Sequence, residues 1–309
     1  MTHPAYPISN SIMSNIDRLR SESSTFLHYT SLEAFYNIMD TGRLRFTSAK
    51  STNDPSEFLF GKEIVDRALE EIIPELNARD QQVVSECKTD LPNRDFRAFV
   101  FCMSEALENE EAVGELSQWR LYGGDGRGIA LVFDVSDSIR RSLMETQGSI
   151  PRKVIYGEEE GLALVKDEIK AYFAGIGQLP KSELDQLYRE NMTNAGYLGN
   201  RLFWLPSVIK HKAYSHEREV RLIRGDIGER AGNPLIFTER GSIRRPAIEL
   251  PMCLAYNQPP HDFNYSTICK IIIGPSGDQS AIEDSIKFYL EARNYRIPVL
   301  KSNIPYRAI

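Results

Sequence analysis

Residues 99–103 and 128–133 read FVFCM and GIALVF, and these two unbroken apolar runs decide the fold class. Strands that are buried on both faces carry such runs, because both of their sides meet the protein interior. Shorter strands are expected at residues 26–30, 44–47, 153–156, 217–224, 268–273 and 298–301. The helical patterns between them follow no regular strand–helix–strand rhythm, which favours an α+β domain over a doubly wound parallel sheet.

The first helix of the chain has well-marked ends. Ser31 suits its N-cap, apolar residues follow at helical spacing, and Gly42 stands where helices commonly stop. Further helices are predicted at residues 56–77, 114–122, 158–170, 181–203 and 281–293. We expect a single domain over residues 1–309, with a loose polar arm at residues 1–22 and a helical insertion at residues 158–203.

Composition narrows the class of protein. The 309 residues are 41% hydrophobic and 26% charged, with a net charge of -6, which argues against a broad basic surface that coats nucleic acid. The four cysteines form no CxxC pair, so we expect reduced thiols and neither a zinc site nor a disulfide framework. No segment reads as a signal peptide or a membrane span, and no GxGxxG or GxxxxGK[ST] motif occurs. We therefore expect a cytoplasmic protein that makes no membrane contact.

Polar residues at the end of the first expected strand form one candidate site. His28, Tyr29 and Thr30 directly precede a helix N-terminus, where side chains and free N–H groups can meet an anionic ligand. An imidazole can donate or accept a hydrogen bond near neutral pH. The alternative is a strand-end histidine whose hydrogen bonds are satisfied by the backbone.

A second candidate lies between the two apolar runs. Ser104 follows a buried strand, and Trp119 and Tyr122 stand three residues apart before the glycine-rich turn at residues 123–126. Two aromatic side chains at this helical spacing form either a pocket wall or part of the core.

The third candidate is the segment EREVRLI at residues 217–223. Strand alternation would place Glu217, Glu219 and Arg221 on one face. Two neighbouring carboxylates can stabilise a cationic transition state, whereas a solvated edge-strand face is the structural alternative. Residues 201–224 hold six Lys or Arg and two Glu, so this stretch has a local net charge of +4 within an acidic chain.

Four sequence blocks resemble a bacterial family known as domain of unknown function 2971. They read HYTS, FTSAKSTNDPSE, FCMSE with SQWRLYGGDGRGIALVFD, and YSHEREVRLI, and they occur in the family's order. The resemblance covers the chain from about residue 26 to the final expected strand.

The opening block, HYTSLEAFYNIMDTGRLRF, also resembles the first block of the ADP-ribosyltransferase superfamily. This resemblance implies a split mixed β-sheet with peripheral helices, and NAD as a substrate without a metal. It also implies that His28 holds a ribose of NAD, that Tyr122 or Trp119 stacks on nicotinamide, and that Glu219 is the catalytic glutamate. Glu217 would be the upstream member of an ExE pair. Ser104 could replace the tyrosine, as in the Arg-Ser-Glu type, but no first-position arginine is found.

The function implied by this resemblance is transfer of ADP-ribose from NAD to a macromolecule, as a toxin or an anti-phage effector with an antitoxin or regulator as partner. A nucleic-acid acceptor would lie near Lys210, Lys212 and Arg218. The alternatives are an NAD glycohydrolase on the same fold and a non-catalytic binding module. An RNA 2′-phosphotransferase is disfavoured, because the arginines that such chemistry needs are not matched.

Overall fold

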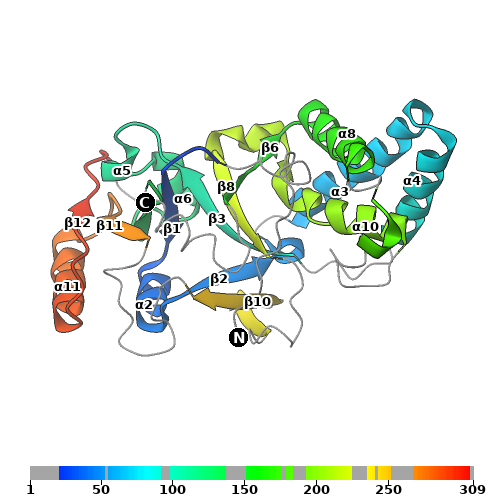
Figure 1. The fold of residues 1–309 in the computed structure, drawn as a ribbon. Coiled ribbons are helices and arrows are strands. Elements are labelled where there is room, and N and C mark those ends of the chain that lie inside the picture. Colours follow the sequence, from blue (N-terminus) through cyan, green and yellow to red (C-terminus); the bar gives the residue numbers. More distant parts are fainter. Residues whose placement is uncertain are drawn as a thin grey trace. The chain divides into compact units, whose positions relative to one another are not determined.

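The computed structural model describes residues 21–52, 55–91, 98–136, 151–175, 179–183, 193–224, 235–240, 243–251 and 267–306 (Figure 1). The chain divides into two compact units. Unit 1 comprises Met1–Arg20, Ala49–Ala98 and Arg152–His216, and unit 2 comprises Ser21–Ser48, Phe99–Pro151 and Glu217–Ile309. The expected arm at residues 1–22 falls almost wholly outside the described residues, as do Asn53 and Asp54 of the NDPSE block.

Unit 2 is built on a mixed, open β-sheet, which confirms the α+β class. Hydrogen-bonded neighbours follow the order β12 (Val299–Lys301), β11 (Ile268–Ile273), β4 (Ile129–Asp134), β1 (Thr25–Thr30), β3 (Phe99–Glu105), β2 (Arg43–Ser48), β10 (Ile243–Pro251), β9 (Ile236–Arg240). These pairs are antiparallel except β11 with β12. The two apolar runs form β3 and β4, while β9 and β10 were not predicted from the sequence.

The sheet divides at β3. Its C-terminal end pairs with β1, with Leu27 opposite Ser104, and its N-terminal end pairs with β2, with Ser48 opposite Phe99. Strand β8 (Glu219–Arg224) runs along the other edge of β3 from end to end. Strands β1 and β2 therefore share one edge of β3, and β1 leaves that edge just after Leu27.

The two faces of this sheet carry separate apolar clusters. The larger cluster includes Phe26, Phe101 and Phe133 and packs under α2 (Leu32–Thr41) and α11 (Gln279–Ala292). The smaller one includes Leu27 and Val132 and packs around Trp119 of α6 (Leu116–Leu121). Because neighbouring residues of a strand point to opposite faces, these clusters define an α2 face and an α6 face.

The predicted ends of the first helix are confirmed. The Ser31 side chain accepts a hydrogen bond of 3.1 Å from the Ala34 N–H, which satisfies one free donor at the N-terminus of α2. Gly42 adopts the left-handed conformation at φ 63°, and its N–H donates to the Ile38 carbonyl at 2.9 Å. Glycine pays no steric penalty at this φ, which is why the helix ends there.

Unit 1 is mainly helical. It contains α3 (Pro55–Ile72), α4 (Ala78–Asp90), α8 (Glu158–Ala174), α10 (Asn194–Leu202) and the parallel pair β6 (Ile155–Tyr156) with β7 (Ile209–Lys210). Helices α8 and α10 lie within the predicted helical segments at residues 158–170 and 181–203 or extend them, and α4 was not predicted. The remaining short elements are η2 (Ala49–Ser51), η3 (Ile73–Glu75), α5 (Glu110–Val113), β5 (Pro151–Lys153), η7 (Leu205–Val208) and η8 (Lys212–Glu217).

A buried ion pair joins two helices of unit 1. The Arg201 Nε of α10 donates to the Glu168 Oε2 of α8 at 2.8 Å, and both side chains are almost fully buried. Elsewhere in the described ranges, Cys87 is buried, Cys102 and Cys269 are partly buried, and Cys253 lies outside these ranges. No helix of the described ranges is long and apolar enough to cross a membrane.

Candidate functional site

The start of β8 differs from the sequence prediction. The strand begins at Glu219, whereas Glu217 closes the 3-10 helix η8. Arg218 between them has a φ of 45°, in the left-handed region that side chains other than glycine rarely adopt. The prediction that Glu217 lies on the same strand as Glu219 is therefore wrong, because the left-handed turn at Arg218 ends the alternation.

Glu219 and Arg221 lie on the α6 face and are buried. Glu219 is opposite Ser104 in the register, and Ser104 is in turn opposite Leu27 of the α6-face cluster. Arg221 Nε and Nη2 donate to Glu219 Oε1 and Oε2 at 2.8 and 2.9 Å, and the two residues are only 2% and 8% exposed. These two side chains are thus a buried bidentate ion pair, which rules out a solvated edge-strand face for them.

Helix α6 brings a tyrosine to the neighbouring carboxylate. The hydroxyl of Tyr122, at the C-cap of α6, donates to Glu217 Oε1 at 2.8 Å. Tyr122 also packs against the α6-face cluster, and Glu217 is buried. The structure therefore brings Tyr122, Glu217, Glu219 and Ser104 to the same side of the sheet.

Sequence reasoning missed Gln118, which precedes Tyr122 by one helical turn. Gln118 is 2% exposed, and its Nε2 has no hydrogen-bond partner in the described part of the chain. Residues four apart on a helix are neighbours on one face, so Gln118 faces the same way as Tyr122. We call the polar group on this face the β8 cluster; it consists of Ser104, Gln118, Tyr122, Glu217, Glu219 and Arg221.

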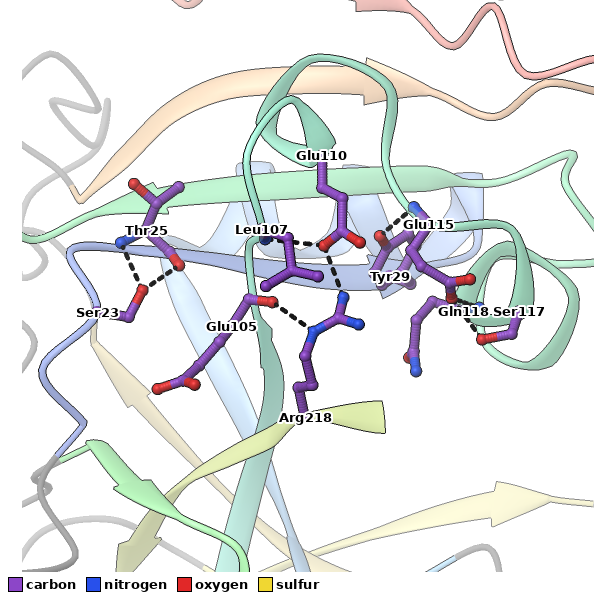
Figure 2. A network of polar contacts seen from close by, with 10 residues as sticks. All are labelled: Ser23, Thr25, Tyr29, Glu105, Leu107, Glu110, Glu115, Ser117, Gln118 and Arg218. Carbon is purple, nitrogen blue, oxygen red and sulfur yellow. Dashed lines mark hydrogen bonds and ion pairs between the residues drawn. The ribbon is translucent and has the colours of Figure 1, made fainter. Parts of the chain in front are cut away.

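The Arg218 side chain, whose contacts Figure 2 shows, holds the turn between the two glutamates in place. Its Nη2 donates to Glu110 Oε2 at 2.6 Å, and its Nε contacts the Glu105 carbonyl at 3.4 Å. Its own carbonyl accepts from the Glu105 N–H at 3.0 Å. Glu110 Oε2 also accepts from the Leu107 N–H at 2.9 Å, so α5, the end of β3 and the start of β8 form one network. This network stabilises the strained φ of Arg218.

Tyr29 and Trp119 are core residues of the α6-face cluster. The Tyr29 hydroxyl accepts a 2.8 Å hydrogen bond from the Glu115 N–H, and burial raises the pKa of Tyr29 far above its usual value. Trp119 is fully buried, stands edge-on to Tyr29 and donates through Nε1 to the Val113 carbonyl at 3.0 Å. Both side chains therefore occupy core positions on the α6 face, and Tyr122 is left as the aromatic residue beside the glutamates.

His28 lies on the opposite face of the sheet. It is opposite Leu131 of the α2-face cluster, and its ring stacks on Phe101 at 4.3 Å between centroids. Burial lowers its pKa to about 4, so the ring is neutral at pH 7, and Nδ1 donates to the Cys102 carbonyl at 2.8 Å. Thr30 points to the same face by alternation. The structure therefore does not bring His28 or Thr30 to Glu219, and the strand-end alternative describes His28 better.

The three basic residues expected near a nucleic acid have different surroundings. Lys210 is buried, pairs with Glu57 at 3.1 Å and lies over the Tyr214 ring. Arg218 is held by Glu110 as described above, and Lys212 is exposed. Among these three, Lys212 is thus the one whose side chain is open to solvent. Within the described ranges, no group of three or more His, Cys, Asp or Glu side chains could hold a metal ion.

Comparison with known proteins adds one finding. No curated protein and no solved structure matches the chain. Residues 118–222 match the model of a family described as a protein of unknown function, DUF2971. The matched segment begins at Gln118 on α6 and ends at Leu222 on β8, and it therefore contains most of the β8 cluster. The match supports the resemblance to that family over this part of the chain.

Proposed function

We propose that the chain transfers ADP-ribose from NAD to a macromolecular acceptor, and that the β8 cluster is its active site. The observation that carries the proposal is the pair of buried carboxylates, Glu217 and Glu219, on the same side of the sheet as Tyr122. His28 has no part in this site. The cytoplasm, where NAD is available, is the proposed place of action.

The chemistry of the cluster fits cleavage of a glycosidic bond. As the bond between nicotinamide N1 and ribose C1′ breaks, positive charge develops on the ribose, and the Glu219 carboxylate stabilises it. The acceptor oxygen or nitrogen then bonds to C1′, and its proton passes to Glu217. Nicotinamide leaves with the electron pair of the broken bond.

Two neighbours would hold these carboxylates in position. Arg221 binds both oxygens of Glu219 and so fixes the orientation of its carboxylate. Tyr122 does the same for Glu217 through one hydrogen bond. We therefore assign Arg221 and Tyr122 as positioning residues.

A non-catalytic binding module is the second candidate, because Arg221 engages both oxygens of Glu219 in a buried ion pair. Such a pair can serve as a structural link that keeps the glutamate away from any substrate. This candidate predicts that NAD is not consumed. An NAD glycohydrolase would consume NAD and transfer ADP-ribose to water.

The test is incubation with NAD labelled in its ADP-ribose part, separately with RNA, DNA and bacterial protein extract. The wild type is compared with Glu219→Gln and with Glu168→Gln. The latter is a matched control, because it removes one charge from a buried arginine pair in unit 1. We expect the wild type and Glu168→Gln to release nicotinamide and to label one class of acceptor, while Glu219→Gln does neither.

The other results distinguish the alternatives. Nicotinamide release without label on any acceptor indicates a glycohydrolase. No release by the folded wild type contradicts the proposal and favours the binding module. For the toxin or anti-phage role, expression in bacteria should slow growth with the wild type and not with Glu219→Gln.

A further inference from the structure

The amide of Gln118 is a buried donor without a partner. Nε2 can donate two hydrogen bonds, and in the described part of the chain it makes none, although the residue is 2% exposed. Leaving such a group unpaired is costly, and native proteins rarely do so without a reason. A ligand that brings a hydrogen-bond acceptor would remove this cost.

The position of Gln118 on α6 puts its side chain on the same helical face as Tyr122, a member of the β8 cluster. The Glu115 side chain accepts a 2.9 Å hydrogen bond from the Gln118 N–H and so fixes the first turn of α6. Figure 2 shows the Gln118 side chain extending away from Glu115, with the amide at its far end. Tyr122, one turn later on the same helical face, reaches Glu217.

We propose that Gln118 is a binding residue, whose Nε2 donates to the carboxamide oxygen of the nicotinamide group of NAD. This inference rests on the proposed function. A carboxamide oxygen is a strong acceptor, which matches the unpaired Nε2. The pyridinium ring of NAD carries a positive charge, which matches the neighbouring carboxylates of Glu217 and Glu219. The nicotinamide group thus pairs with the Gln118 donor and brings its positive charge to the side of the sheet that carries the two carboxylates.

The experiment uses two cationic probes that differ in the carboxamide. The probe 1-methylnicotinamide carries it, and 1,3-dimethylpyridinium has a methyl group instead. Their affinities are measured by calorimetry on the full chain, for the wild type and for Gln118→Met, which keeps the length of the side chain and removes the amide. Gln82→Met is the control, because Gln82 is an exposed helical glutamine of unit 1 that donates to Glu86.

We expect the wild type and Gln82→Met to bind 1-methylnicotinamide about tenfold more tightly than 1,3-dimethylpyridinium. Gln118→Met should bind both probes equally. It should unfold at the same urea concentration as the wild type or a higher one, because the Nε2 that it removes makes no hydrogen bond in the described part of the chain. A wild type that does not discriminate between the probes, or a Gln118→Met variant that still does, would overturn the inference.

Nicotinamide release from NAD, measured in parallel, separates this inference from the proposed function. A wild type that prefers 1-methylnicotinamide but releases no nicotinamide supports the contact and overturns the proposed function. A wild type that turns over NAD while Gln118→Met keeps the preference for the carboxamide overturns the contact alone.

Discussion

Two buried arginine–glutamate pairs of this chain look alike but have different surroundings. Arg201 with Glu168 joins two helices of unit 1, and Arg221 with Glu219 lies within one strand of unit 2. The same side of the sheet as the second pair also carries another buried carboxylate, Glu217, and the unpaired amide of Gln118. A buried ion pair by itself is explained by packing and charge neutralisation. The unpaired Gln118 amide has no such explanation, and it singles out the β8 cluster as the place for a ligand.

Removal of the arginine should have the largest effect, and it should be the same for both pairs. Arg201→Met and Arg221→Met each leave a buried carboxylate without its cation, which costs about 3–5 kcal/mol of unfolding free energy. Urea unfolding followed by circular dichroism measures this loss. A loss below about 1 kcal/mol for Arg221→Met would show that Glu219 finds another partner or becomes protonated, and the two pairs would then not be equivalent.

Glu219→Gln should separate the two pairs by activity. We expect nicotinamide release to fall about 100- to 1000-fold, because the amide cannot stabilise the developing positive charge. Glu168→Gln should release nicotinamide at nearly the wild-type rate per folded molecule. If both variants lose nicotinamide release equally, the loss results from reduced stability, and the two ion pairs do not differ in their role in activity.

The tyrosine beside Glu217 offers a smaller test. Tyr122→Phe removes a hydrogen bond to a carboxylate and should cost about 1.5–3 kcal/mol of unfolding free energy. Tyr172→Phe is the control, because the buried Tyr172 hydroxyl donates to the neutral Asn194 carbonyl at 3.0 Å. That loss should be about 0.5–1.5 kcal/mol. If Tyr122→Phe loses less unfolding free energy than Tyr172→Phe, Glu217 does not depend on Tyr122 for its position.

His28→Asn should have the smallest effect on turnover, less than about twofold, since His28 lies on the α2 face. The titration of His28 should also make the stability of the wild type depend on pH. The pKa of His28 is about 4 in the folded protein against 6.5 ordinarily, so unfolded chains take up the proton first as the pH falls. The free energy of unfolding of the wild type therefore falls between pH 6.5 and pH 4. Below pH 4, His28 causes no further fall. Urea midpoints across this range should show a weaker fall for His28→Asn, and a strong loss of turnover in this variant would return His28 to the active site.

Local signals in the sequence predicted much of the fold. Ser31 and Gly42 marked the ends of α2 correctly, and the unbroken apolar runs identified β3 and β4. Strand alternation correctly placed Glu219 and Arg221 on one face, but it failed at Glu217, because an arginine in the left-handed region leaves no sequence signal.

The relative placement of distant residues was harder to predict. His28 and Glu219 face opposite sides because of the register of β1 and β8 against β3, and no local pattern encodes that register. Gln118 was within reach, since a polar residue one turn before Tyr122 shares its helical face. Its importance emerged only from its burial and its unpaired amide.

Hydrogen–deuterium exchange with and without NAD tests the central claim most directly, because it reports where a ligand binds without requiring turnover. We predict that NAD slows exchange in α6 and at the start of β8, and leaves the exchange of α8 and α10 around Glu168 and Arg201 unchanged. Protection of β1 and α2 around His28, with α6 and β8 unaffected, would contradict the assignment of the β8 cluster as the ligand site.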